Sequence, residues 1–186
     1  MITVVSGLPR SGTSMMMQIL QAGGLPVLSD QERVADEHNP RGYLEYKKTK
    51  QLATDNTWLQ EAEGKSIKVV SQLLYHLPPQ FEYRVIFMRR DLTEVIRSQE
   101  HMLGSRQSDS GPEQHVMREH FQRHLEALEA WLGRQPNMRV LPCNFSDMVA
   151  DPTRLAPSIS RFLGILLDPE RMASAVDPAL YRQRAN

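Results

Sequence analysis

A strand, a glycine-bounded loop and an apolar helix follow one another directly at the start of this chain. The β-branched run at residues 2–6 is typical of a buried strand, residues 7–12 (GLPRSG) form the loop, and residues 14–22 have the pattern of a helix. Unpaired amide groups and the dipole at a helix N-terminus favour a bound anion, and glycines let the backbone approach it closely. We therefore expect an anion-binding loop at the carboxyl end of a buried strand.

The loop has the spacing of a phosphate-binding P-loop but lacks its lysine. Four residues separate Gly7 from Gly12, and Ser14 fills the Ser/Thr position that follows. Thr13 stands where the lysine belongs, and Arg10 is the cation that the loop offers instead. Because a guanidinium suits a tetrahedral oxyanion, we expect Arg10 to stabilise charge on a transferring group.

Strands and helices alternate along the rest of the chain. We expect further strands at residues 66–70, 84–88 and 138–141, and further helices at residues 44–55, 91–102, 113–132 and 153–163. This alternation predicts an α/β fold of three layers, with a central, mostly parallel sheet and helices on both faces. Ligands bind such sheets at the carboxyl ends of the strands, where the loop lies. The Ser/Gly-rich residues 104–112 are expected to form a loop or lid.

The length and the charge of the chain limit the class of protein to which it can belong. The 186 residues fit one domain, residues 1–186, and the balance of 22 Lys and Arg against 22 Asp and Glu argues against a general nucleic-acid binder. No stretch approaches the roughly 20 apolar residues of a membrane span, and the N-terminus lacks the pattern of a signal peptide. The single cysteine, Cys143, fits a buried position at a strand end and a reducing compartment, so a cytoplasmic protein is expected.

A second group of polar residues follows the strand expected at residues 84–88. Arg90 comes at the strand end, where its side chain is expected to reach the ligand crevice, and Ser98 follows eight residues later. Asp91 and Glu94 have the spacing of a helix capping box and are interpreted as structural. Arg90 and Ser98 are candidates for a second phosphate site, the alternative being a surface arginine and an ordinary helix serine.

Together these two groups resemble the cofactor motifs of sulfotransferases that use 3′-phosphoadenosine 5′-phosphosulfate (PAPS). Residues 7–14 are similar to the family's 5′-phosphosulfate loop, and Arg90 with Ser98 is similar to its 3′-phosphate motif. Residues 39–45, 144–152 and 160–164 resemble further family segments. The resemblance implies a P-loop kinase-like fold and a set of cofactor-binding residues: Pro9, Arg10, Ser11, Gly12, Thr13, Ser14, Arg90 and Ser98.

The resemblance also implies the reaction. A sulfuryl group would pass from PAPS to an acceptor hydroxyl or amine by in-line attack, without a metal, leaving 3′-phosphoadenosine 5′-phosphate (PAP). PAPS carries one phosphosulfate and a separate 3′-phosphate, so it needs two anion sites rather than the lysine and Mg²⁺ that serve β- and γ-phosphates. The acceptor class stays open between a small molecule, a carbohydrate, a lipid and a peptide, with residues 29–45 and 103–117 expected to select it. The sequence leaves the oligomeric state open.

The general base is less constrained. Many family members carry Lys-Thr-His near the end of a central strand, whereas this chain has Lys68-Val69-Val70, with His76 eight residues beyond Lys68. Other branches use a glutamate after the first helix, so Glu45 is the predicted base, the alternative being a solvated residue beside Lys47 and Lys48. Lys68 is expected to stabilise the bridging oxygen, the alternative being a plain surface lysine.

Two other functions and several secondary features stay open. The chain could be a P-loop kinase or hydrolase with a displaced cation, which would need a Mg²⁺-binding carboxylate at a strand end, or a PAPS-binding protein without catalysis. Arg182 or Arg184 could close over the 3′-phosphate, the alternative being a frayed terminus. The remaining polar and aromatic candidates fit a solvated helix face or the core better than a metal site or an acceptor pocket: His115, His120, His124, Trp58 and Trp131.

Overall fold

The structure is a computed structural model that describes residues 1–30, 32–36, 39, 41–103 and 112–181. Within these residues a four-stranded parallel sheet of order β2-β1-β3-β4 forms the centre, from β1 (Ile2–Gly7), β2 (Ser66–Val70), β3 (Tyr83–Arg89) and β4 (Met138–Asn144). The helices are α1 (Thr13–Ala22), α2 (Leu92–Leu103), α3 (Pro112–Leu132), α4 (Phe145–Ala150), α5 (Pro152–Leu163) and α6 (Pro169–Ser174). Four 3₁₀ helices complete the described elements: η1 (Lys47–Gln51), η2 (Thr57–Ala62), η3 (Ser71–His76) and η4 (Pro178–Leu180).

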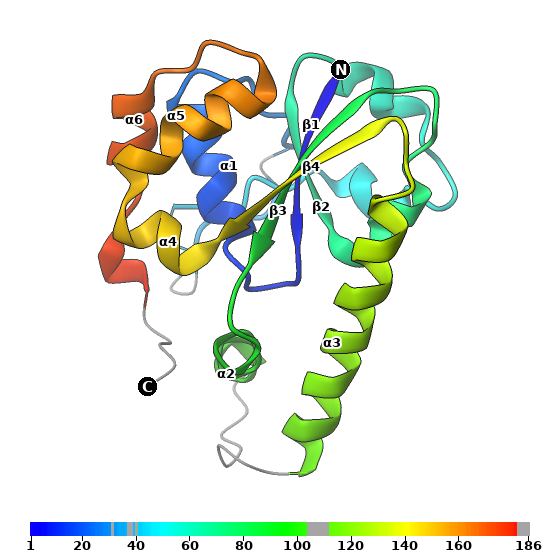
Figure 1. Ribbon diagram of the computed structural model, residues 1–186, viewed down its shortest axis with the longest axis vertical. Helices are drawn as coiled ribbons and strands as arrows, with labels where there is room; N and C mark the ends of the chain where they lie inside the picture. Colours follow the sequence, from blue (N-terminus) through cyan, green and yellow to red (C-terminus); the bar gives the residue numbers. More distant parts are fainter. Residues whose placement is uncertain (31, 37–38, 40, 104–111, 182–186) are drawn as a thin grey trace.

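Apolar layers cover both faces of the sheet, because neighbouring side chains of a strand point to opposite faces. Val5 packs with α1, α4, α5 and α6, whereas Val4 packs with η2, η3 and the C-terminal half of α3. Figure 1 shows the same division, with α1, α4, α5 and α6 on one side of the sheet and α3 on the other. The expected three-layer α/β architecture is confirmed.

Most of the expected elements are confirmed. The strands lie where the sequence predicts them, although β4 runs three residues further than expected, to Asn144. Pro142 is tolerated there because β4 is an edge strand, where no further strand needs its missing N–H group. The four long helices agree within one residue at each end. The loop or lid expected at residues 104–112 lies outside the described residues, apart from Pro112, which begins α3.

The helix expected at residues 44–55 is wrong, because only η1 forms within this segment. Leu44 has a left-handed backbone with φ 49°, which an α-helix cannot contain. Thr49 then closes a tighter i→i+3 turn, with its amide and its hydroxyl both donating to the Tyr46 carbonyl at 2.9 and 2.7 Å. The segment instead follows the edge of the cavity described below.

Cys143 lies buried in β4, as expected for a core residue at a strand end. Burial raises the pKa of its thiol to about 11, so only about one thiol in a thousand is ionised at pH 8. We expect an aromatic disulfide reagent to react slowly with the native protein at pH 8 and at the normal rate once denaturant is added. Rapid reaction of the native protein would contradict the burial of this strand end.

No described helix combines the length and the apolar character needed to cross a membrane.

Candidate functional site

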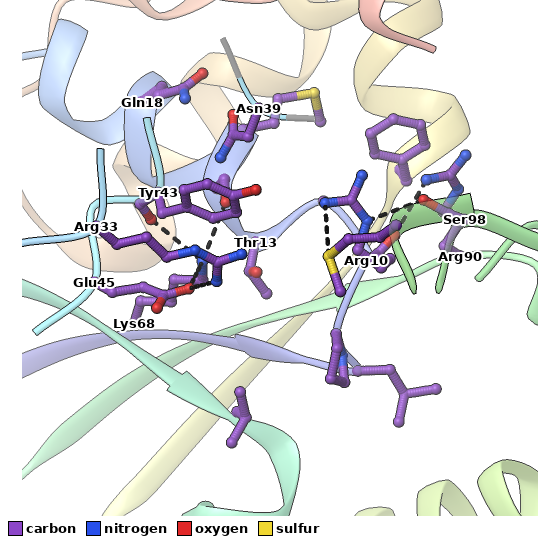
Figure 2. Close-up of a pocket in the computed structure, with 18 of the residues that line it drawn as sticks. Arg10, Thr13, Gln18, Arg33, Asn39, Tyr43, Glu45, Lys68, Arg90 and Ser98 are labelled. Carbon is purple, nitrogen blue, oxygen red and sulfur yellow. Dashed lines mark hydrogen bonds and ion pairs between the residues drawn. The ribbon is translucent and has the colours of Figure 1, made fainter. Parts of the chain in front are cut away.

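A cavity of about 400 Å³ opens at the carboxyl ends of the central strands, beside the N-terminus of α1. The loop before α1, the end of β2 and residues of α2 line it, together with side chains from the segment between Arg33 and Lys50. Figure 2 shows that the charged side chains labelled in it lie in two separate sets, one of them beside Ser98. We call them the Lys68 group (Lys68, Glu45 and Arg33) and the Arg90 group (Arg90, Arg10 and Ser98).

The loop before α1 depends on two glycines for its close packing. A Cβ at Gly7 would lie 2.4 Å from Ser11 Oγ and 2.6 Å from the Met88 carbonyl oxygen. Pro9, Arg10, Gly12, Thr13 and Ser14 line the cavity. Ser11 is not among its described lining residues, and its hydroxyl is buried beneath the loop without a partner in the described part of the chain. The loop therefore presents to the cavity the start of α1, where unpaired amide groups favour an anion.

Gly12 packs directly against Phe145, so its replacement tests the loop geometry. Its φ of 101° favours glycine, and a Cβ there would lie 2.5 Å from the Phe145 ring. We expect Gly12→Ala to lower the free energy of unfolding by about 1–3 kcal/mol more than Gly24→Ala, measured by urea denaturation. Gly24 is the matched control, because it has φ 100° but no atom within 4 Å of its added Cβ. Equal losses in the two variants would contradict the close Phe145 contact.

Lys68 points from β2 toward α1, opposite to its neighbours Ile67 and Val69, which face the other layer. Its ammonium group donates to Ser14 Oγ at 3.1 Å, to the Tyr43 carbonyl at 3.2 Å and to Glu45 Oε1 at 3.1 Å. Burial lowers the pKa of Lys68, while the Glu45 carboxylate acts in the opposite direction. Lys68 is therefore a buried cation of the cavity, not a surface lysine.

Arg33 is a member of the Lys68 group that the sequence analysis did not identify. Its Nη1 donates to Glu45 Oε1 at 3.1 Å, and its guanidinium carbon lies 3.4 Å from the centre of the Tyr43 ring. The Tyr43 hydroxyl in turn donates to Asp36 at 2.8 Å. No local pattern distinguishes Arg33, because the loop conformation alone brings it to Glu45.

The two oxygens of the Glu45 carboxylate have different surroundings. Oε1 accepts from both Lys68 and Arg33, at 3.1 Å each. Within the described residues, Oε2 has no hydrogen-bond partner, and Glu45 lines the cavity. One oxygen is thus fixed by two cations, whereas the other is left to accept a hydrogen bond from a ligand. Glu45 precedes η1 instead of lying on a lysine-rich helix.

The Arg90 group forms the second set of charges. Arg90 Nη1 donates to the Arg10 carbonyl at 3.1 Å, and Arg10 Nε donates to Ser98 Oγ at 3.0 Å. Figure 2 shows the Arg10 side chain turned toward Arg90 and Ser98, away from Lys68. Burial lowers the pKa of Arg10 from its usual value. The structure therefore places Arg10 with Arg90 and Ser98, which were expected to form a separate site.

The capping interpretation of Asp91 and Glu94 is confirmed for Asp91. Its carboxylate accepts from the amides of Thr93 and Glu94 at 2.8 and 3.3 Å, at the start of α2. The Glu94 carboxylate instead accepts from Arg90 Nε at 2.8 Å and from the Tyr181 hydroxyl at 2.6 Å. The sequence analysis missed this link, because an acid at this spacing fits a capping box equally well.

The histidine and tryptophan candidates are not among the described residues that line the cavity. His124 contacts Ser71 Oγ at 2.9 Å, and His115 pairs with Glu119 on the exposed face of α3. In the described ranges, no group of three His, Cys, Asp or Glu side chains could hold a metal ion. Trp58 is buried in the core, with its ring against Tyr46. Arg182 and Arg184 lie outside the described residues.

Comparisons with known proteins bear on the family and the fold of this chain. A family model described as "Sulfotransferase domain" matches residues 2–183. The structure resembles that of the "Sulfotransferase Domain from the Curacin Biosynthetic Pathway" with a TM-score of 0.52 and 13% identity, covering 97% of this chain and 88% of that one. A mouse sulfotransferase, SULT7A1, solved in complex with PAP, matches with a TM-score of 0.47 and 17% identity, over 94% of this chain and 62% of that one. This chain thus spans less than two thirds of the mouse protein.

A search of curated proteins found no match. The first structural likeness, at 13% identity, shows the fold alone: the P-loop kinase-like α/β fold that the sequence predicts. The family model covers almost the whole chain, including the loop before α1 and both charged groups. The chain belongs to the sulfotransferase family.

Proposed function

We propose that this protein is a PAPS-dependent sulfotransferase that transfers a sulfuryl group to an acceptor hydroxyl or amine. Membership of the family implies sulfuryl transfer. The observation that supports PAPS as the donor is the division of one cavity into an anion-binding loop and two separate cationic groups. A donor with a 5′-phosphosulfate and a separate 3′-phosphate matches this division.

The loop and the two groups have different roles in the proposal. The loop around Gly12, Thr13 and Ser14 binds the phosphosulfate through the N-terminus of α1. Arg90 and Ser98 bind the 3′-phosphate, and Arg10 lies between this phosphate and the loop. We further propose that residues 1–186 act as one domain, because both charged groups come from segments spread along the chain.

In the proposal, the Lys68 group catalyses the sulfuryl transfer. Glu45 Oε2 accepts the proton of the acceptor hydroxyl as its oxygen bonds to sulfur, and the bond between sulfur and the bridging oxygen breaks. Lys68 exchanges its contact with Ser14 Oγ, at 3.1 Å, for the bridging oxygen and neutralises the charge that develops there. The products are PAP and the sulfated acceptor, and Glu45 then releases its proton to solvent. Arg33 keeps Glu45 oriented throughout.

A kinase or hydrolase needs a carboxylate to bind Mg²⁺ near the loop. The ends of β3 and β4 supply Arg89-Arg90 and Cys143-Asn144 instead. Glu45, a member of the Lys68 group, and Glu94, the partner of Arg90, are both paired with cations, as is Asp177, which also lines the cavity. These contacts favour a metal-free reaction over phosphoryl transfer.

Calorimetric titration tests the donor. We expect PAP to bind at micromolar concentration or tighter without Mg²⁺, and ATP to bind at least 10-fold more weakly with or without it. Micromolar binding of Mg²⁺-ATP without binding of PAP would overturn the proposal. Labelled PAPS with a panel of sugar, phenol, lipid and peptide acceptors then tests turnover, and tight PAP binding with no product would identify a binding protein without catalysis.

A further inference from the structure

We propose that Tyr181 is a positioning residue for the 3′-phosphate site, so that discrimination in favour of a 3′-phosphorylated nucleotide depends on the segment after α6. The inference rests on the proposed function, because it assigns Arg90 to the 3′-phosphate. Tyr181 acts through Glu94 and Arg90, and it is not among the described residues that line the cavity.

The Glu94 carboxylate links Tyr181 to Arg90. The Tyr181 hydroxyl donates to Glu94 Oε1 at 2.6 Å, and Arg90 Nε donates to Glu94 Oε2 at 2.8 Å. The Arg90 and Glu94 side chains are 9% and 5% exposed, so solvent screens this pair only weakly. A hydrogen bond to each oxygen fixes the plane of the carboxylate, and that plane sets the direction of the guanidinium.

Two aromatic rings pack against the same guanidinium. The Arg90 guanidinium carbon lies 4.4 Å from the centre of the Phe145 ring and 5.4 Å from that of Tyr181. The two rings meet edge to face, with centres 5.0 Å apart and planes at 89°. Phe145 also packs against Gly12, so Tyr181, Arg90 and the anion-binding loop belong to one packed unit.

The segment that carries Tyr181 is attached to the body of the protein at a second point. Arg41 donates to the Ala175 carbonyl at 2.5 Å and to the Asp177 carboxylate at 3.2 Å. Ala175 and Asp177 also line the cavity. These contacts hold the segment of Tyr181, and through it Arg90, in place before a ligand binds. Because Arg90 is already ordered, it loses less side-chain entropy on binding, which strengthens its affinity for the 3′-phosphate.

The test compares PAP with adenosine 5′-monophosphate (AMP), which lacks the 3′-phosphate. We expect Tyr181→Phe to weaken PAP binding about 10-fold, the effect expected for one hydrogen bond to a charged group, and to leave the Kd for AMP within about twofold. The substitution keeps the ring against Phe145, so the protein should stay folded, with a fall in melting temperature no larger than the loss of one hydrogen bond to a buried carboxylate produces. Tyr75→Phe is the control, because Tyr75 also packs edge to face, on Trp131, but does not line the cavity among the described residues.

The outcomes separate the inference from the function on which it rests. If the wild type binds PAP no more tightly than AMP, the 3′-phosphate site of the proposed function fails, whatever Tyr181 does. If the wild type prefers PAP and Tyr181→Phe keeps the full preference, the role of Tyr181 is overturned. Equal weakening of PAP and AMP would overturn it as well, because it would show a general structural effect.

A double-mutant cycle tests the route through Glu94. Glu94→Gln keeps the shape of the side chain but removes the charge that holds Arg90, so it should weaken PAP binding at least as much as Tyr181→Phe. If Tyr181 acts through Glu94, adding Tyr181→Phe to Glu94→Gln should change the Kd for PAP by less than about twofold. Fully multiplicative effects of the two substitutions would contradict this route.

Discussion

Replacing Lys68 with methionine is expected to lower kcat for sulfuryl transfer about 100- to 1,000-fold while changing the Kd for PAP by less than about threefold. Methionine keeps an unbranched apolar stem where the Lys68 side chain is 9% exposed, so the packing between β2 and α1 is retained. The lost positive charge matters most where negative charge develops during bond breaking. In the proposed site, PAP already carries its full charge and would be held mainly by the loop and the Arg90 group.

The Lys68 prediction is measured with labelled PAPS and any acceptor found by the panel described above. Lys65→Met is the matched control. Lys65 lies just before the first residue of β2, and it is not among the described residues that line the cavity. It should leave kcat unchanged. A Lys68→Met variant with wild-type kcat would remove Lys68 from the reaction and make Arg33 and Arg10 the next cations to test.

Replacing Arg90 with alanine should weaken PAP binding on the order of 100-fold and also destabilise the protein. Arg90 is 9% exposed and pairs with Glu94, so its loss leaves a buried carboxylate facing the position proposed for the 3′-phosphate. Breaking such a pair from one side costs about 3–5 kcal/mol of stability. Arg90→Lys should recover little affinity, because one ammonium group cannot reproduce the fork that contacts both Glu94 and the Arg10 carbonyl.

Arg89→Ala is the control for this prediction. Arg89 is the neighbouring residue, but it pairs with Glu129 on the outside, where both side chains are more than 40% exposed. Such a surface pair contributes at most about 1 kcal/mol, so PAP affinity and melting temperature should barely change. If Arg90→Ala unfolds the protein, Arg90→Met combined with Glu94→Gln removes both charges and should fold without binding PAP tightly. Tight PAP binding by that variant would exclude Arg90 from the 3′-phosphate site.

The anion-binding loop could be predicted from the sequence because its determinants are local. A β-branched strand, two glycines separated by four residues and an apolar helix fix the order of elements and the direction of the helix N-terminus. The position of Arg90 was predictable for a related reason. In a parallel sheet the carboxyl ends of the strands share one edge, so a strand-end residue and the loop lie near each other.

The failed helix at residues 44–55 shows where local reasoning stops. Its lysines, its one glutamine and its alanine favour a helix, but the segment must cross the edge of the cavity and bring Glu45 to Lys68. That tertiary contact fixes Leu44 in a left-handed conformation and leaves only a 3₁₀ turn. The sequence analysis identified both Glu45 and Lys68 as candidates, but not that they form an ion pair.

The sequence by itself determined the layered fold, the anion-binding loop and the residues at the strand ends, because each of these depends on neighbours within about ten positions. The tertiary structure alone decided which charges meet. Arg33 reaches Glu45 across twelve positions, and Tyr181 reaches Glu94 across eighty-seven. Side chains so far apart in the chain leave no periodic signal in the sequence, because their contact results from how loops pack over the sheet edge.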